Sequence, residues 1–139
     1  MEILWLTSPR LENEGYPLYL RRPEYENIWD FQNKFPKLLK ITHRLDEVKP
    51  NGLPESDYNK SLADLDHKLV SLFNNSEGII FLIETFGGER NYYYFISETV
   101  DHTSKVDAVR ATEIHANLDV NAQMDKAWKF LQEYPIRIF

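Results

Sequence analysis

The feature that most constrains the fold is a pair of strand-like runs separated by two glycines. The runs are GIIFLIETF (residues 78–86) and RNYYYFIS (residues 90–97), and Gly87-Gly88 lies in the turn between them. Such runs around a glycine turn are typical of a β-hairpin, because glycine adopts the positive φ that tight turns require. The middle of the chain is therefore expected to form two adjacent antiparallel strands.

A helix is expected immediately before this hairpin, beginning at Pro54. Proline fits the first helical turn, where its missing N–H costs nothing, and Glu55 and Asp57 suit the positive end of the helix dipole. One apolar stripe at steps of three and four residues follows, made by Tyr58, Leu62, Leu65, Leu69, Leu72 and Phe73. Asn74, Asn75 and Gly78 are expected to close the helix.

Weaker patterns complete the order of elements. Strands are expected over residues 1–7, 16–22, 37–48 and 112–120, and helices over residues 23–35, 104–111 and 121–135. From His43 onward the order is β-α-β-β-α-β, followed by a terminal helix. This order predicts a single α+β domain, with a ferredoxin-like sandwich over residues 36–139 whose helices cover one face of the sheet. Residues 1–35 are expected to extend the sheet as an N-terminal hairpin.

Composition limits the class of protein. The chain has 139 residues, enough for a sizeable core, and no cysteine, which excludes disulfides and thiolate metal sites. No export signal is readable in MEILWLTSPR, and no apolar run approaches the roughly 18 residues of a membrane span. A cytoplasmic protein is expected, without contact with a membrane.

Negative charge is concentrated in the middle of the chain. Residues 51–125 contain thirteen acidic and five basic groups, whereas the whole chain has a net charge of −6. Such a field repels nucleic-acid phosphates and attracts cationic partners. The alternative is that the acidity serves solubility alone.

Four consecutive aromatics, Tyr92 to Phe95, present two pairs in a strand. Tyr92 and Tyr94 point to one face of the sheet, and Tyr93 and Phe95 point to the other. One pair is expected in the core, while the other faces solvent, a second layer or a partner. RNA-recognition domains carry stacking aromatics on a comparable strand. The acidic charge argues against direct nucleic-acid binding here.

Catalytic, cofactor and metal motifs are not recognisable in the sequence. The four histidines, His43, His67, His102 and His115, show no ligand spacing, and no nucleophile elbow or phosphate loop is present. The many carboxylates have no spacing that predicts convergence, so a solvated acidic face is the simplest interpretation. We therefore expect a protein that is not an enzyme and binds no cofactor or metal.

Several segments resemble the domain-of-unknown-function family 695. They are PKLLKITHRL, NGLPESDY, FGGERNYYYF and MDKAWKFLQEYP, which together span about residues 36–135. The positions that match the family pattern are Gly52, Leu53, Pro54, Gly88, Arg90, Trp128 and Pro135. The family looks distantly similar to the regulator of ribonuclease activity B, an acidic ferredoxin-like inhibitor of a ribonuclease. The resemblance implies a non-catalytic binding protein and supplies no catalytic residue.

Two hypotheses of function follow. In the first, the protein binds and inhibits a basic protein partner, such as a nuclease or a toxin, in the manner of an immunity protein or a ribonuclease regulator. Its contact residues would be Asp57, Asp64, Asp66, Glu89, Tyr92 and Tyr94. In the second, the protein binds a small molecule in a pocket between the sheet and the terminal helix, near Arg90 and Trp128. The sequence leaves the oligomeric state open.

Overall fold

The computed structural model describes residues 5–13 and 16–139, with side chains from residue 17 onward. The strands in this part of the chain are β1 (Trp5–Asn13), β2 (Tyr16–Pro23), β3 (Lys37–Arg44), β4 (Gly78–Phe86), β5 (Glu89–Ile96) and β6 (Asn117–Met124). The helices are α1 (Ser56–Ser61), α2 (Ala63–Val70), α3 (His102–Thr112), α4 (Lys129–Gln132) and the 3-10 helix η1 (Ile28–Phe31). No helix in the described residues is both long and apolar enough to cross a membrane.

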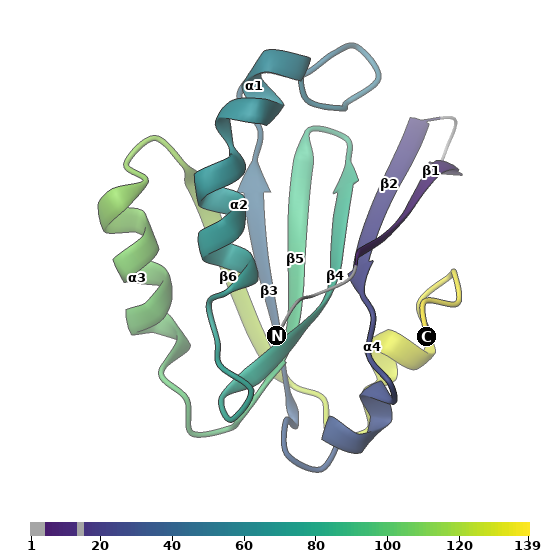
Figure 1. Ribbon diagram of the computed structural model, residues 1–139, viewed down its shortest axis with the longest axis vertical. Helices are drawn as coiled ribbons and strands as arrows, with labels where there is room; N and C mark the ends of the chain where they lie inside the picture. Colours follow the sequence, from purple (N-terminus) through teal and green to yellow (C-terminus); the bar gives the residue numbers. More distant parts are fainter. Residues whose placement is uncertain (1–4, 14–15) are drawn as a thin grey trace.

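The six strands form one sheet in the order β1-β2-β4-β5-β3-β6, and each pair of neighbours is antiparallel (Figure 1). The predicted α+β class and the predicted β4–β5 hairpin are thereby confirmed. Gly87 and Gly88 form the turn of this hairpin at φ values of +60° and +83°. The β1–β2 hairpin extends the sheet beyond β4, as expected, although β1 continues to Asn13, where a turn was predicted. Residues 1–4 of the predicted first strand lie outside the described residues.

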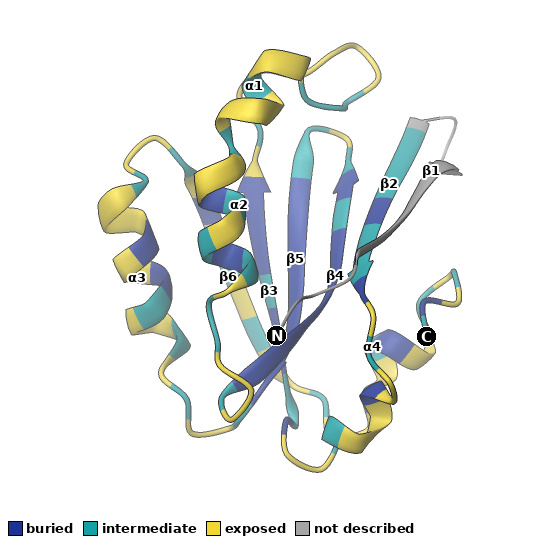
Figure 2. Ribbon diagram, viewed as in Figure 1, coloured by how far each residue is buried: buried dark blue, intermediate teal, exposed yellow. Residues whose placement is uncertain are grey.

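Apolar side chains cover both faces of the sheet, so the expectation of helices on one face only is wrong. Helices α2 and α3 lie over the first face (Figure 1), where Leu65 and Val106 pack on Tyr92 and Tyr94. We call this the helical face. On the opposite face η1, α4 and the C-terminus contribute Ile28, Leu131 and Ile138 to a second cluster. The central strands are consequently buried along most of their length (Figure 2).

The helix predicted from Pro54 onward is divided into α1 and α2 at Leu62. Leu62 ends α1 and precedes α2 with φ −87° and ψ 3°, outside regular helical geometry. Before the break, the Ser61 hydroxyl donates to the carbonyl of Tyr58, a local bond that competes with the regular helical pattern. The apolar stripe nevertheless faces the sheet, because Leu65 and Leu69 are buried.

The last predicted strand and helix have different bounds in the structure. Residues 121–124, which were assigned to the helix, pair with β3 as the end of β6. The remaining helix, α4, has four residues, because Trp128 adopts a left-handed conformation (φ 54°, ψ 42°) immediately before it. Asp125 caps this short helix by accepting from the backbone N–H groups of Lys129 and Phe130. Strand pairing thus overrides the helical spacing of Met124, Ala127 and Trp128.

Candidate functional site

Both aromatic pairs of β5 are buried, so neither is open to a partner. Tyr92 and Tyr94 are each 1 % exposed under the helices, and Tyr93 and Phe95 are 4 % and 0 % exposed on the opposite face. The hydroxyl of Tyr94 donates to the carbonyl of Leu69, at 2.7 Å. The second pair thus packs against a second layer, which is one of the three expected alternatives. Tyr92 and Tyr94 were predicted to contact a partner, but their burial excludes direct contact.

Arg90 and Trp128 lie on opposite faces of the sheet, so the predicted pocket that would join them does not form. Arg90 shares the helical face with Tyr92, whereas Trp128 stacks on Phe95 with ring centroids 4.0 Å apart. The Trp128 indole N–H donates to the carbonyl of Phe35 at 2.8 Å, and its side chain is fully buried. Trp128 is therefore a core residue, whereas Arg90 lines a different pocket.

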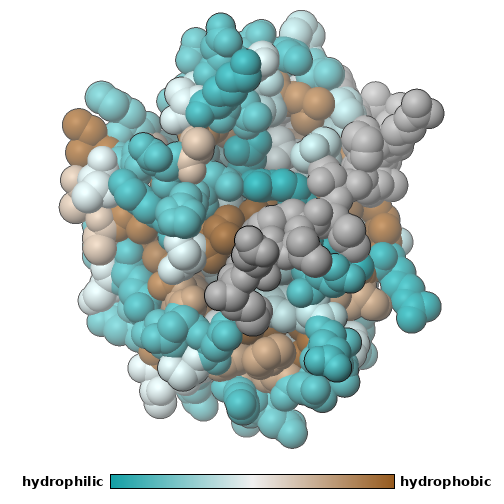
Figure 3. All heavy atoms as spheres, in the orientation of Figure 1, coloured by the Kyte–Doolittle hydropathy of each residue, from teal (hydrophilic) through white to brown (hydrophobic). Residues whose placement is uncertain are grey.

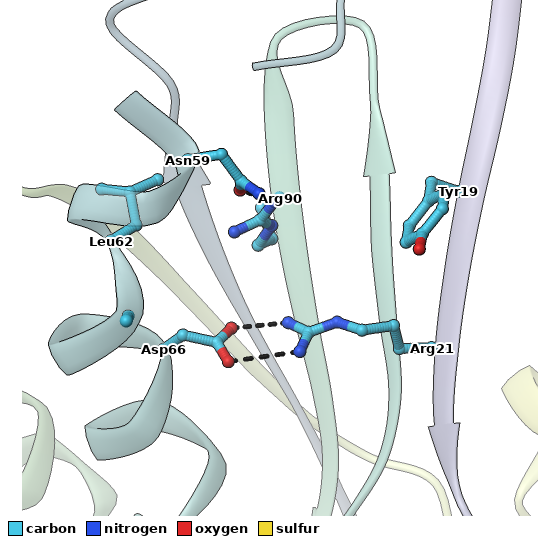
Figure 4. Close-up of a pocket in the computed structure, with 7 residues that line it drawn as sticks. Tyr19, Arg21, Asn59, Leu62, Asp66 and Arg90 are labelled. Atoms are coloured by element: carbon cyan, nitrogen blue, oxygen red, sulfur yellow. Dashed lines mark hydrogen bonds and ion pairs between the residues drawn. The ribbon is translucent and has the colours of Figure 1, made fainter. Parts of the chain in front are cut away.

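That pocket lies on the helical face, between the α1–α2 segment and strands β2 and β5. Its volume is about 210 Å³, and it is lined by Tyr19, Arg21, Asn59, Leu62, Ala63, Asp66 and Arg90. We call it the arginine pocket. Figure 4 shows Arg21 reaching from β2 toward Asp66 on α2, with Asn59, Arg90 and Tyr19 together on one side of this pair. Cross-strand register explains this meeting, since Tyr19 pairs with Thr85 and Thr85 pairs with Arg90.

Asp66 is the one carboxylate among the described residues that line the arginine pocket, and both of its oxygens accept hydrogen bonds. Arg21 donates to its two oxygens at 2.6 and 3.2 Å, and the Tyr92 hydroxyl donates to Oδ1 at 2.7 Å. Burial by itself raises the pKa of the Asp66 carboxyl, but hydrogen bonding and charge from Arg21, with the bond from Tyr92, outweigh it and lower the pKa. Asp66 is thus ionised at neutral pH and neutralises Arg21.

Arg90 differs from Arg21, because its guanidinium forms no direct ion pair in the described part of the chain, although its charge acts on Asp66 across the pocket. The side chain is buried, at 8 % exposure, and it donates to two neutral acceptors, Thr85 Oγ1 at 3.0 Å and Asn59 Oδ1 at 2.8 Å. No Asp or Glu oxygen among the described residues lies within 4.0 Å of its guanidinium. Buried charges in proteins are normally paired, so this position is suited to an anion from outside the chain.

Part of the Arg90 guanidinium remains open to such an anion. Its bonded nitrogens are Nε and Nη2, while Nη1 makes no hydrogen bond to a described residue. Among those residues, the one fully buried side-chain polar atom without a partner is His43 Nδ1. Since Nη1 is also without a partner there, it must be accessible to solvent. The N–H groups of Nη1 can therefore donate to a ligand in the arginine pocket.

His43 lies beside Arg90 on the neighbouring strand β3 and adds no charge to its surroundings. The two residues pair across β3 and β5, and His43 is buried. Burial lowers the pKa of His43, the nearby charge of Arg90 lowers it further, and Asp46 partly opposes the shift. His43 is consequently neutral at pH 7. In the described part of the chain, no three His, Asp or Glu side chains gather as metal ligands.

The remaining acidic residues proposed for partner contact do not join Asp66. Asp57 on α1 and Asp64 on α2 are exposed, and Glu89 at the start of β5 is half-exposed. The surface over these helices is largely hydrophilic (Figure 3). Asp57 and Asp64 form no ion pair with any described residue, whereas Asp66 points into the arginine pocket. The predicted acidic set is thus divided between the surface and the pocket.

Five of the described pocket residues were not predicted as site residues from the sequence: Tyr19, Arg21, Asn59, Leu62 and Ala63. Alternation in residues 16–22 places Tyr19 and Arg21 on the same side of β2, opposite Leu20, which is a usable signal. Asn59 lies three residues before Leu62 and seven before Asp66, and this helical spacing puts the three side chains on one side of the predicted helix. Neither signal shows that β2 and α2 meet, because Arg21 and Asp66 are separated by 45 positions.

The fold and the pocket define the class: an α+β protein built on one antiparallel sheet, with a small charged pocket under its helices. The chain belongs to DUF695, a family of unknown function whose sequence profile matches residues 24–134. The resemblance noted in the sequence is thereby confirmed. Searches of curated proteins and of solved structures found no match. The more distant likeness to the ribonuclease regulator stays a prediction.

Proposed function

We propose that this protein is a non-catalytic binding domain that takes a small anionic ligand into the arginine pocket. The observation that carries the proposal is Arg90, a buried guanidinium with neutral acceptors and no carboxylate beside it among the described residues. A bound anion would supply the missing charge and accept from the open N–H groups of Nη1. A ligand site is expected to be a concave surface with a few polar groups, and the arginine pocket has this form. This is the small-molecule hypothesis, moved from Trp128 to the opposite face of the sheet.

The test is a thermal-unfolding screen against small anions at constant ionic strength. A ligand that binds the folded state raises the melting temperature by mass action. The screen should use the wild type, R90Q, and R137Q as a matched control, since Arg137 is exposed and lies outside the pocket. We expect at least one class of anion to stabilise the wild type and R137Q, but not R90Q.

A second variant separates loss of binding from loss of folding. Ala63 lines the pocket from an exposed position at the start of α2, so A63F should narrow the pocket without removing a charge. Cooperative unfolding of A63F, with no response to an anion that stabilises the wild type, would support the site. Equal responses of A63F, R90Q and wild type would show that the anions act elsewhere.

A second candidate function is binding of a basic protein surface, which would inhibit that partner. It is supported by Asp57 and Asp64, which are exposed, seven residues apart, and without an ion pair among the described residues. Complementary charge accelerates association in a salt-dependent way. A pull-down at low and high salt would identify a partner, and the D57K/D64K double variant should slow its association. Association at an unchanged rate would exclude this acidic surface.

We also propose that residues 36–139 form a ferredoxin-like core and that the protein acts in the cytoplasm. The order β6-β3-β5-β4, with helices between β3 and β4 and between β5 and β6, supports the first assignment. The absence of cysteine is compatible with the second. An experimental structure with another strand order would refute the first, and recovery outside the cytoplasm in cell fractionation would refute the second.

A further inference from the structure

We infer that the ligand of the arginine pocket is a small carboxylate with a single negative charge and a compact apolar body. The inference rests on the proposed function and narrows it to one chemical class. It follows from the charge balance of the pocket, from the N–H groups that remain for a ligand, and from the size and chemistry of the walls.

The charge balance favours a monoanion. Among the described residues, two guanidinium groups and one carboxylate line the pocket. Arg21 and Asp66 form an ion pair at 2.6 Å, with side chains 25 % and 21 % exposed, and so largely neutralise each other. The unbalanced charge is that of Arg90, and one negative charge on the ligand compensates it. A second negative charge on the ligand would have no unbalanced guanidinium among the described lining residues to compensate it.

The hydrogen-bonding geometry favours a planar carboxylate over a tetrahedral dianion. The Nε and Nη2 nitrogens of Arg90 are engaged by Thr85 and Asn59, which fixes the plane of the guanidinium. The open Nη1 can donate to one oxygen of a planar carboxylate. A phosphate group has three acceptor oxygens and a charge of about −1.5 to −2 at pH 7, which is more than the one open nitrogen of Arg90 matches.

The walls favour a small ligand, and although they are mainly polar they offer apolar contact in one part of the pocket. The volume of about 210 Å³ lies below the roughly 300–1,000 Å³ of sites that hold drug-sized ligands. Leu62 and Ala63 provide aliphatic surface on the helix side, and the ring of Tyr19 lines the β2 side (Figure 4). An aromatic or short aliphatic body of a few carbon atoms can contact these groups while its carboxylate meets Arg90.

The experiment compares matched probes by thermal unfolding at constant ionic strength and pH 7. The probes are benzoate and butyrate, their neutral counterparts benzyl alcohol and butanol, and the dianions inorganic phosphate and sulfate. At about ten times the dissociation constant, we expect a carboxylate to raise the melting temperature by about 3–5 °C. The neutral probes and the dianions should leave it unchanged.

The variant D66N tests the charge balance directly. Without the Asp66 charge, the described lining of the pocket has two guanidinium groups and no carboxylate, so its affinity for sulfate and phosphate should rise by about tenfold or more. Each variant is compared with its own unliganded melting temperature, so lower stability of D66N does not affect the reading. Should D66N prove too unstable, A63F serves instead and should abolish the response to benzoate.

The outcomes separate this inference from the proposed function. Stabilisation of the wild type by carboxylates, together with gained sulfate binding in D66N, supports both. If phosphate or sulfate stabilises the wild type as strongly as benzoate, and R90Q does not respond, the monocarboxylate inference is wrong and the anion site stands. If no anion stabilises the wild type, or R90Q responds as the wild type does, both are wrong.

Discussion

Replacing Asp66 with asparagine should lower the free energy of unfolding by about 2 kcal/mol at pH 7. The carboxylate accepts two bonds from Arg21 and one from Tyr92, and D66N removes the charge from all three. Exposed ion pairs contribute about 0–1 kcal/mol, whereas breaking a buried pair costs about 3–5 kcal/mol. Because the two side chains are about a quarter and a fifth exposed, the expected loss lies between these limits.

The assay is urea unfolding followed by circular dichroism, repeated from pH 7 to pH 3. The folded-state pKa of Asp66 is lowered, so its stabilisation is fully present above the unfolded pKa, near 3.9, and is lost as pH falls through the folded pKa. The difference between wild type and D66N should therefore be constant from pH 7 to about pH 5 and shrink below about pH 4. Y92F, which keeps the ion pair, should lose only about 1 kcal/mol. A D66N deficit that is unchanged at pH 3 would refute the electrostatic explanation.

Three further predictions concern the rest of the fold. W128A should lower the free energy of unfolding by about 3–5 kcal/mol, because it removes a buried indole. W128F should lower it by about 1–3 kcal/mol, because phenylalanine keeps the stacking but leaves a buried carbonyl unpaired. Urea unfolding that ranks the two variants otherwise would contradict this. G52A should lower the free energy of unfolding by about 2–3 kcal/mol in the same assay, since residue 52 has φ +85° and a Cβ there would lie 2.9 Å from Gly87 Cα. G87A should lower it by only about 1–2 kcal/mol, because residue 87 has φ +60° but a Cβ there would meet open space. The lowered pKa of His43 means that the unfolded chain takes up its proton first, so stability should fall as pH drops below about 6.5; H43Q should flatten this slope in pH-dependent unfolding, and the exposed-site variant H115Q should not.

Local patterns predicted those elements whose neighbours along the chain agree with them. The β4–β5 hairpin is set by Gly87-Gly88 between two β-prone runs, and the stripe through Leu65 and Leu69 faces the sheet as its spacing requires. The C-terminal segment was predicted wrongly, because residues 121–124 fit a helix and a strand equally well by apolar spacing. Pairing with β3 decides for the strand, since it satisfies backbone groups along the edge of the sheet.

The candidate site was predicted only in part. Arg90 and Asp66 were selected as separate residues for different functions, and the structure brings them into one pocket. Burial of all four aromatics on β5 was not predictable from alternation, because alternation assigns side chains to two faces without showing that both faces are covered. Here η1, α4 and the C-terminus cover the second face.

The sequence by itself determined the α+β class, the central hairpin, the helical stripe before it and the family, because these depend on spacing and turn chemistry between near neighbours in the chain. The tertiary structure alone decided which side chains are buried and which charges meet. Arg21 pairs with Asp66 across 45 positions, while Arg90 is placed against neutral acceptors from two other elements. Such distant encounters arise from strand order and register, which local periodicity does not encode, and they create the arginine pocket on which the proposed function rests.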